Sequence, residues 1–214
     1  MIEHPGFVLW FTGLSGAGKT TIAVALENQL RARGIRIERL DGDTVRQSLT
    51  KDLGFSKEDR DKNIERVTFV AKLLSRNNVA VLSSFISPYA ATRDHVRGET
   101  TNFIEVFVDA PLETCIERDV KGMYKKAIAG EIPNFTGISD PYEAPANPDI
   151  HVKTHEQTLE ESVQTIIRRS SHGWNRTNTF PLKSRPNPPH RHKSKSSRAG
   201  EPFISPVFVL SIIA

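Results

Sequence analysis

The sequence has 214 residues, 37% of them hydrophobic, which is enough for one α/β domain with its own core. Its single cysteine, Cys115, excludes an internal disulfide and favours a reducing, cytoplasmic location. The net charge of +4 resides in residues 172–214, which hold seven basic residues and one acid, so residues 1–171 carry a net charge of −2 and give no electrostatic case for nucleic-acid binding.

The first half of the chain alternates strand and helix patterns. The apolar run Phe7–Thr12 predicts a strand, and because it leads directly into a glycine-rich loop it does not have the pattern of a secretory leader. Thr20–Arg33 predicts a helix that ends at Gly34. Arg36–Leu40 predicts a second strand, and Lys57–Asn77 predicts a long helix with apolar residues at helical spacing.

The second half continues the alternation, with further strands expected at Val79–Ser84, Phe103–Val108 and Asp149–Val152. Pro111 stands where the first turn of a helix tolerates proline. Residues 119–148 are rich in Lys, Gly and Pro and predict a long mobile excursion. Thr158 and Glu161 form a capping-box pattern before a helix to about Arg169. No apolar stretch approaches the roughly 20 residues that span a bilayer, so no membrane association is expected.

This alternation predicts an α/β fold of the P-loop nucleotide-kinase type, a three-layer sandwich with a mainly parallel central sheet. Residues 1–171 form the expected domain. Residues 172–214 hold six of the 13 prolines and a basic run without periodicity, and they are expected to be a disordered tail. Because ligands bind beyond the carboxyl ends of the strands in such sheets, the motifs at those ends are the candidates for chemistry.

The strongest motif is a phosphate-binding loop between the first strand and the first helix, Gly13-Leu14-Ser15-Gly16-Ala17-Gly18-Lys19-Thr20. Its glycines let backbone N–H groups converge on phosphate oxygens at a helix N-terminus. Lys19 is expected at the β- and γ-phosphates of ATP, and Thr20 at Mg²⁺. The chain lacks the Asn-Lys-x-Asp run of guanine-specific proteins, and Asp-x-x-Gly does not follow the third strand, so a GTPase switch is disfavoured.

Two carboxylates, Asp41 and Asp43, follow the second strand, which we expect beside the P-loop strand. Transfer to a hydroxyl group needs an acceptor for its proton and an anchor for Mg²⁺ and its waters, and two carboxylates can divide these tasks. The alternative is a polar turn, which Asp-Gly commonly makes. We favour the catalytic interpretation because the two carboxylates follow a P-loop in the sequence.

The segment that follows carries candidate contacts for an anionic acceptor. Arg46, Arg60 and Arg66 have planar forks that suit phosphate and sulfate oxygens, although arginines on an amphipathic helix are often only a solvated face. Phe55 is able to stack on a base or to belong to the core. Further along, the run from Arg118 to Lys126 places cations where closure of a lid would neutralise phosphates and exclude water.

Taken together, the motifs closely resemble the adenylyl-sulfate (APS) kinase family. The resemblance covers roughly residues 5–169 and rests on the P-loop with Trp10-Phe11-Thr12 before it, Leu40-Asp41-Gly42-Asp43, Leu53-Gly54-Phe55-Ser56, Asp59-Arg60, Asn63-Ile64, Phe85-Ile86-Ser87-Pro88, Arg118-Asp119-Val120-Lys121-Gly122 and Asn134-Phe135-Thr136-Gly137-Ile138. The chain departs from the family at Thr44, where Asn usually follows Asp-Gly-Asp, and in the tail after Ser171.

The resemblance implies transfer of the ATP γ-phosphate to the ribose 3′-hydroxyl of adenylyl sulfate in sulfate assimilation, with Mg²⁺ as cofactor. It implies that Asp43 activates the hydroxyl, that Asp41 and Thr20 support Mg²⁺, that Lys19 and Ser87 take part in catalysis, and that Arg118 joins the P-loop in binding ATP. The implied acceptor site consists of Arg46, Phe55, Arg60, Asn63, Ile86, Ser87, Lys121 and Phe135, with the adenine held between Phe55 and Phe135. Ser87 is the position at which a phosphoserine is often assigned in this family, although direct transfer does not need one.

Two alternatives remain at this stage. One is a P-loop kinase for another nucleotide or a small hydroxyl compound. The other is a binding module in which the basic cluster His190–Lys195 tethers a nucleotide-gated domain to a polyanion. The second is weaker because the cluster is short and has no interleaved aromatic residue to stack on bases. The partners expected are therefore ATP and adenylyl sulfate, with no nucleic acid and no membrane, and the sequence leaves open whether the chain forms a homodimer.

Overall fold

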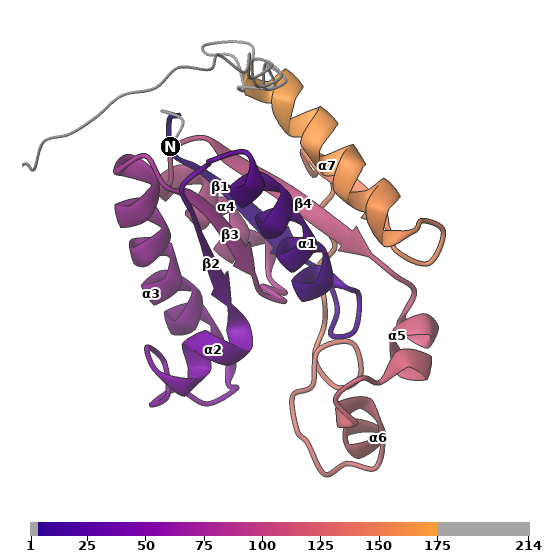
Figure 1. Ribbon diagram of the computed structural model, residues 1–214. Coiled ribbons are helices and arrows are strands. Elements are labelled where there is room, and N and C mark those ends of the chain that lie inside the picture. Colours follow the sequence, from indigo (N-terminus) through magenta and orange to yellow (C-terminus); the bar gives the residue numbers. More distant parts are fainter. Residues whose placement is uncertain (1–3, 175–214) are drawn as a thin grey trace, which may run out of the picture. The chain divides into compact units, whose positions relative to one another are not determined.

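A computed structural model describes the backbone of residues 4–174 and the side chains of residues 4–170 (Figure 1). Five parallel strands form one sheet in the order β2-β3-β1-β4-β5, which makes the expected, mainly parallel sheet fully parallel. The strands are β1 Phe7–Thr12, β2 Ile37–Asp41, β3 Ala80–Ser84, β4 Phe103–Asp109 and β5 Ile150–Lys153. All their carboxyl ends therefore lie at one edge of the sheet.

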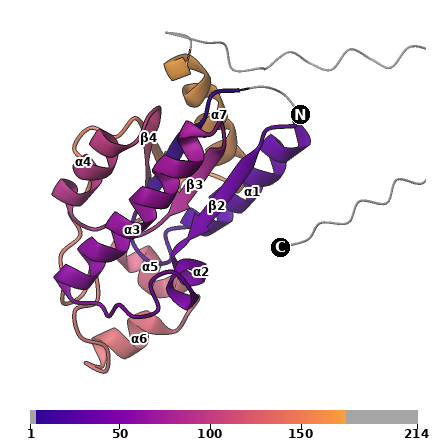
Figure 2. The ribbon, with the colours of Figure 1, turned by 90° about the vertical axis from the view of Figure 1, so that its left-hand side faces the viewer.

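Helices cover both faces of the sheet and complete the expected three layers (Figure 1, Figure 2). On one face, α1 (Lys19–Ala32) and α7 (Leu159–Trp174) share a core cluster with Leu9, Phe11 and Leu82. On the other face, α3 (Lys57–Arg76) and α4 (Ala90–Glu99) pack with Val8, Trp10 and Val81. Residues at alternate positions of β1 and β3 supply the two clusters, which is why residues 7–11 and 80–82 are apolar on both faces of the sheet.

The remaining helices gather at the carboxyl edge of the sheet, where the strand arrows end in Figure 1. They are α2 (Gly42–Gln47), α5 (Leu112–Arg118) and α6 (Met123–Ile128). Pro111 is the N-cap residue of α5, one position before the first turn in which the sequence predicted it. The capping box before α7 is confirmed as well, because Glu161 N donates to Thr158 Oγ1 at 3.2 Å and Thr158 N donates to Glu161 Oε2 at 2.8 Å.

Several expectations need correction. The second strand does not lie beside the P-loop strand, because β3 separates β2 from β1. The polar turn considered for Asp41-Gly42-Asp43 is instead the start of helix α2, with Asp41 as its N-cap. Helix α4 was missed because it buries only Arg93 and Val96 and so lacks an apolar stripe. Helix α6 lies within the stretch expected as an irregular excursion, and its six residues are too few to show a period.

The C-terminal boundary extends past the expected end of the last helix, since α7 continues to Trp174. By its internal contacts the chain divides into Met1–Leu182 and Lys183–Ala214. The tail expected over residues 172–214 lies outside the described residues beyond Trp174, so its disorder stays a prediction. Within the described part of the chain, no helix is both long and apolar enough to cross a membrane.

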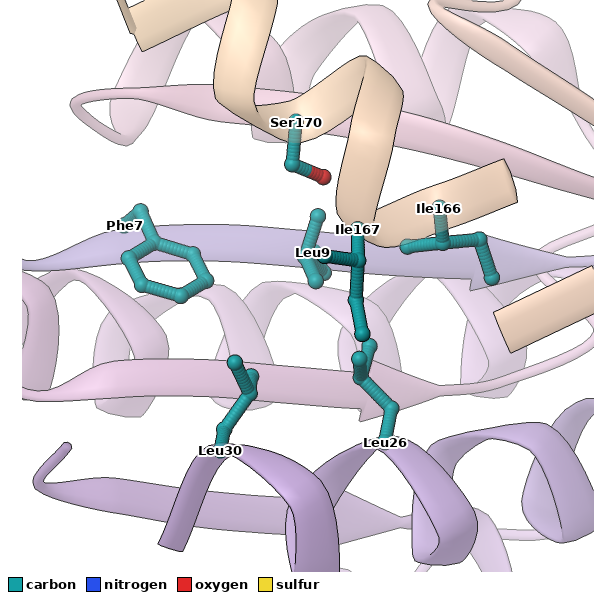
Figure 3. Close-up of a pocket in the computed structure, with 7 residues that line it drawn as sticks. All are labelled: Phe7, Leu9, Leu26, Leu30, Ile166, Ile167 and Ser170. Atoms are coloured by element: carbon teal, nitrogen blue, oxygen red, sulfur yellow. The ribbon is translucent and has the colours of Figure 1, made fainter. Parts of the chain in front are cut away.

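A small apolar pocket lies between β1, α1 and α7, far from the carboxyl edge (Figure 3). It is lined by Phe7, Leu9, Leu26, Leu30, Ile166, Ile167 and Ser170. The Ser170 hydroxyl is buried there without a hydrogen-bond partner among the described residues. An unpaired buried hydroxyl costs free energy, so Ser170 does not stabilise this corner of the core.

Candidate active site

The P-loop turns from β1 into α1 through three glycines with positive φ angles, Gly13, Gly16 and Gly18. A Cβ atom at Gly13 would lie 2.3 Å from the carbonyl oxygen of Val108 on the neighbouring strand, so no other residue fits there. Gly18 caps α1 without a side chain, which leaves the N–H groups of the first turn free to meet an anion.

Lys19 points back into this loop, where Nζ donates to the carbonyl oxygens of Gly13 at 2.8 Å and Leu14 at 2.7 Å. Burial lowers the pKa of Lys19 to about 8, and the nearby charge of Lys121 acts in the same direction. Cys115, Asp41 and Asp43 oppose this shift. The lysine is thus a partly desolvated cation held at the expected position of the transferred phosphate.

Asp41 and Thr20 come together at the carboxyl edge although they lie on different elements. Thr20 Oγ1 donates to Asp41 Oδ2 at 2.7 Å, and the other carboxylate oxygen accepts from Asp43 N at 3.0 Å. Asp41 is buried, with 6% of its surface exposed, whereas the side chain of Asp43 is 65% exposed and forms an ion pair with Lys121. The Asp41 carboxylate is therefore fixed by hydrogen bonds within the site, whereas the Asp43 carboxylate lies at the surface in an ion pair with Lys121.

Three side chains brace the outside of the P-loop. Arg118, predicted at the ATP site, donates to Gly16 O at 3.3 Å and to Thr154 O at 3.0 Å. Thr154 Oγ1 in turn donates to Ala17 O at 2.8 Å, and Tyr124 donates to Ser15 O at 2.9 Å. Sequence reasoning missed Thr154 and Tyr124, although the position of Thr154 at the carboxyl end of β5 was a usable signal.

On the acceptor side, Arg46 and Phe55 lie together, with the guanidinium carbon 4.3 Å from the centre of the ring. Phe55 is 56% exposed, so the core alternative for this residue is wrong. Burial lowers the pKa of Arg46, and the charge of Arg60 acts in the same direction. Arg66 instead pairs with Asp52 at 2.6 Å on the exposed side of α3, as expected for a solvated face.

Two other residues predicted to contact the acceptor are buried in this structure. Phe135 is 6% exposed and meets Tyr124 edge-on, with the ring centres 5.0 Å apart. Within the described residues, no ring contact joins it to Phe55. Asn63 is buried as well, and its Oδ1 accepts from Thr50 Oγ1 at 2.7 Å.

The loop Phe85–Pro88 after β3 is held from several sides. Thr12 Oγ1 donates to Ile86 O at 2.7 Å, and Trp10 Nε1 donates to Ser87 Oγ at 3.0 Å. Ser87 adopts a positive φ angle of 39° and is 3% exposed, and its carbonyl oxygen accepts from the buried Arg93 at 2.8 Å. This environment holds the backbone at Ser87 and leaves its hydroxyl bonded to the Trp10 indole.

The parallel sheet, the P-loop at the end of its central strand and the two carboxylates beside it define the class of P-loop kinases. Within that class, the chain belongs to the adenylylsulphate kinase family, since the sequence model of that family matches residues 5–153.

Relatives of known sequence and structure agree with the family assignment. The adenylyl-sulfate kinase of Rippkaea orientalis is 64% identical over 168 residues, which are 78% of this chain and 93% of its own length. That of Halothermothrix orenii is 59% identical over 167 residues, 78% of this chain and 90% of its own length. The APS kinase of Mycobacterium tuberculosis, solved in complex with AMPPNP and APS, is 44% identical with a TM-score of 0.73, covering 77% of this chain and 97% of that one.

Proposed function

We propose that this chain transfers the γ-phosphoryl group of Mg-ATP to the ribose 3′-hydroxyl of adenylyl sulfate, which gives ADP and 3′-phosphoadenylyl sulfate in sulfate assimilation. Family membership identifies the reaction. One observation supports the roles that we give to the individual residues. Thr20 of the P-loop and Asp41 of β2 meet at 2.7 Å, with the exposed carboxylate of Asp43 two residues further on. Binding of the phosphate donor, support of the metal ion and proton acceptance are thus assigned to different groups, and all of these groups lie at one edge of the sheet.

ATP binds with its phosphates in the loop Gly13–Thr20, where backbone N–H groups and the α1 N-terminus stabilise negative charge. Lys19 exchanges the carbonyl oxygens of Gly13 and Leu14 for β- and γ-phosphate oxygens. Arg118 lies against the outside of the same loop, where it fixes the loop and adds positive charge. These groups act by positioning and charge stabilisation, which are the main sources of catalysis in phosphoryl transfer.

The residues beside the loop fit Mg²⁺. Thr20 and Asp41 offer hard oxygen donors, and Mg²⁺ commonly takes one or two such ligands, with phosphate oxygens and water completing the shell. Within the described residues, no cluster of three or more His, Cys, Asp or Glu side chains is placed to hold a metal ion. Bound there, Mg²⁺ would neutralise developing charge on the phosphates.

Asp43 is the group that accepts the proton of the 3′-hydroxyl. Its carboxylate pairs with Lys121 from the segment between α5 and α6, so acceptor binding must open this pair. Lys121 then becomes available to the anionic part of adenylyl sulfate. The freed carboxylate faces the hydroxyl with nothing bonded to it, as a general base requires.

Arg46, Phe55 and Lys121 form the accessible part of the acceptor site, with Arg60, Asn63, Ile86 and Phe135 behind or beside them. An adenine held between Phe55 and Phe135 requires the buried Phe135 ring to turn away from Tyr124. Ser87 serves as a backbone contact in this proposal, because its hydroxyl is buried and bonded to Trp10. A cytoplasmic location stays an expectation, and whether the chain forms a homodimer stays open.

The test is a coupled assay of ADP release by the full chain with Mg-ATP, in which adenylyl sulfate, AMP, adenosine and small sugar acids are compared as acceptors. We expect turnover that depends on adenylyl sulfate, together with a product phosphorylated at the 3′ position. Folded protein that releases ADP faster with another acceptor would support the alternative of a different small-molecule kinase. The absence of turnover with every acceptor would overturn the proposal.

A further inference from the structure

Two adjacent hydroxyl groups at the carboxyl end of β3 are buried and have no hydrogen-bond partner among the described residues. They belong to Ser83, whose exposed fraction is 0%, and to Ser84, which is 4% exposed. A buried polar group without a partner costs free energy, and most buried polar groups in folded proteins are paired. Each of the two hydroxyls therefore needs an explanation in terms of what it faces.

The two hydroxyls face opposite sides of the sheet, because successive side chains of a strand alternate. Ser83 is the register partner of Trp10 and lies on the side of the core cluster that contains Trp10 and Val81. Ser84 lies on the side of Leu82, in the layer that α1 and α7 cover. The P-loop leads into α1, so Ser84 faces the layer of the phosphate site and Ser83 faces away from it.

Ser84 also lies next to the pair of residues that fit Mg²⁺. It is the register partner of Asp41 on β2. Asp41 is on the same face of the sheet, since its carboxylate accepts from Thr20 Oγ1 at the start of α1 at 2.7 Å. Neighbouring strands of a sheet lie about 4.8 Å apart, so the side chains of Ser84 and Asp41 are neighbours. The unpaired hydroxyl thus belongs to the same corner of the site as the two oxygen donors.

In this structure the Asp41 carboxylate bonds to other groups and not to Ser84. Its Oδ2 accepts from Thr20, and its Oδ1 accepts from Asp43 N at 3.0 Å. The hydroxyl of Ser84 therefore keeps lone pairs that no described group uses. Mg²⁺ usually keeps several of its waters when it binds to proteins, and these waters are hydrogen-bond donors that need acceptors nearby.

We propose that Ser84 is a positioning residue for the metal, whose hydroxyl accepts a hydrogen bond from a water in the coordination shell of the Mg²⁺ that Thr20 and Asp41 support. This inference rests on the proposed function, because it takes Mg-ATP as the phosphate donor. It adds to the site a residue that does not ligate the metal itself and that orients the shell around it.

The alternative is a hydroxyl that only fills space in the core. Both interpretations predict that Ser84→Ala leaves the stability of the unliganded protein unchanged or raises it, because the hydroxyl has no partner to lose there. They differ in the binding of nucleotide. A hydroxyl that holds a metal-bound water contributes only when Mg²⁺ is present, whereas a hydroxyl that fills space contributes in neither case.

The experiment is a calorimetric titration of the full chain with a non-hydrolysable ATP analogue, once with Mg²⁺ and once with EDTA in its place. We expect the Kd measured with Mg²⁺ to rise about ten-fold in Ser84→Ala, as for loss of an outer-shell partner of a metal, and the Kd measured in EDTA to stay unchanged. Ser84→Thr keeps the hydroxyl and should bind the Mg²⁺ complex more tightly than Ser84→Ala does.

The matched control is Ser83→Ala, which removes an equally buried, unpaired hydroxyl from the adjacent position on the opposite face of the sheet. It should leave both Kd values unchanged. A melting curve of each unliganded variant completes the comparison, and a lower melting temperature in Ser84→Ala would mean that the hydroxyl has a partner within the protein, which overturns the inference.

Three binding results would overturn it as well. These are an unchanged Kd for the Mg²⁺ complex in Ser84→Ala, an equal rise of Kd with and without Mg²⁺, and an equal rise in Ser83→Ala or Ser84→Thr. A wild type that binds the analogue no more tightly with Mg²⁺ than without it refutes the metal site of the proposed function. A wild type that gains affinity from Mg²⁺, together with an insensitive Ser84→Ala, refutes only the role of Ser84.

Discussion

At the scale of single residues, Lys19 couples ATP binding to pH. Burial lowers its pKa to about 8 in the free protein, and bound phosphates favour the charged form and raise that pKa. ATP binding above pH 8 should therefore take up a proton, and affinity should fall as pH rises through this range. The stability of the protein without ATP should depend on pH in the opposite direction from the affinity for ATP. The unfolded chain binds this proton more tightly, so Lys19 adds to the free energy of unfolding as pH rises from 8 to 10.5.

Calorimetric titration of ATP at pH 8.5 in two buffers with different ionisation enthalpies measures the proton uptake. Lys62→Ala, which removes an exposed lysine of α3, should retain the uptake, and Lys19→Arg should remove it because arginine does not titrate in this range. Equal binding enthalpies in the two buffers for the wild type would show that Lys19 is already charged before ATP binds.

Asp43 has the clearest expected effect on the chemical step. Asp43→Ala should lower kcat by roughly 10²–10⁴-fold, as for loss of a general base, while ATP binding is largely kept. The side chain is 65% exposed and its pair with Lys121 lies at the surface, so the melting temperature should not change. Lys19→Ala should instead weaken both ATP binding and transfer.

The control for this series is Asp52→Ala, which removes another exposed carboxylate paired with a cation, Arg66 at 2.6 Å. Steady-state kinetics of the three variants and a melting curve for each complete the comparison. Normal turnover by Asp43→Ala would mean that another group accepts the proton.

At the scale of elements, α7 offers two substitutions with different expected outcomes. Thr158→Ala removes the capping box, in which Thr158 Oγ1 accepts from Glu161 N at 3.2 Å, and should lower the free energy of unfolding by about 1 kcal/mol. Ser170→Ala removes a buried hydroxyl without a partner in the described structure and should be neutral or stabilising. Urea denaturation of the full chain measures both.

Both substitutions introduce alanine at the same helix, and the same method measures both free energies of unfolding. Equal losses of stability in the two variants would mean that the Ser170 hydroxyl has a partner in solution, for example an ordered water in the pocket of Figure 3. An unchanged midpoint in Thr158→Ala would mean that α7 is held by its packing alone.

At the scale of the whole molecule, the kinase should not depend on residues after α7. Relatives match about 78% of this chain over 90% or more of their own lengths, so the kinase fold of the family is complete without an equivalent of the remainder. A chain ending at Trp174 should fold and keep the kcat and both KM values of the full chain. Kinetics of the two forms measure this.

Binding of polyanions by the full chain should be weak, should decrease with salt and should disappear with the tail. Titration of both forms with a heparin fragment at two salt concentrations tests that part. A folded, truncated protein without acceptor-dependent activity would require residues 175–214 to contribute to the site or to an essential subunit contact.

The sequence by itself determined the donor half of the site, because that half is built from contiguous backbone. Three glycines and the helix that follows them create the phosphate site wherever they occur after a strand, so Gly13–Thr20 could be placed without knowing its neighbours. The family resemblance implied that Thr20 and Asp41 both support Mg²⁺, and the structure brings the two side chains within 2.7 Å of each other.

Only the tertiary structure decided the strand order, with β3 between β2 and β1, and the acceptor half of the site. The contact between Arg60 and Asp140 spans 80 positions, and that between Tyr89 and Asp140 spans 51. Such contacts leave no periodic or local signal, since they depend on how the loops fold over the sheet edge. The burial of Phe135 and of Arg93 has the same origin, because each is set by the elements that pack around it and not by its neighbours in the chain.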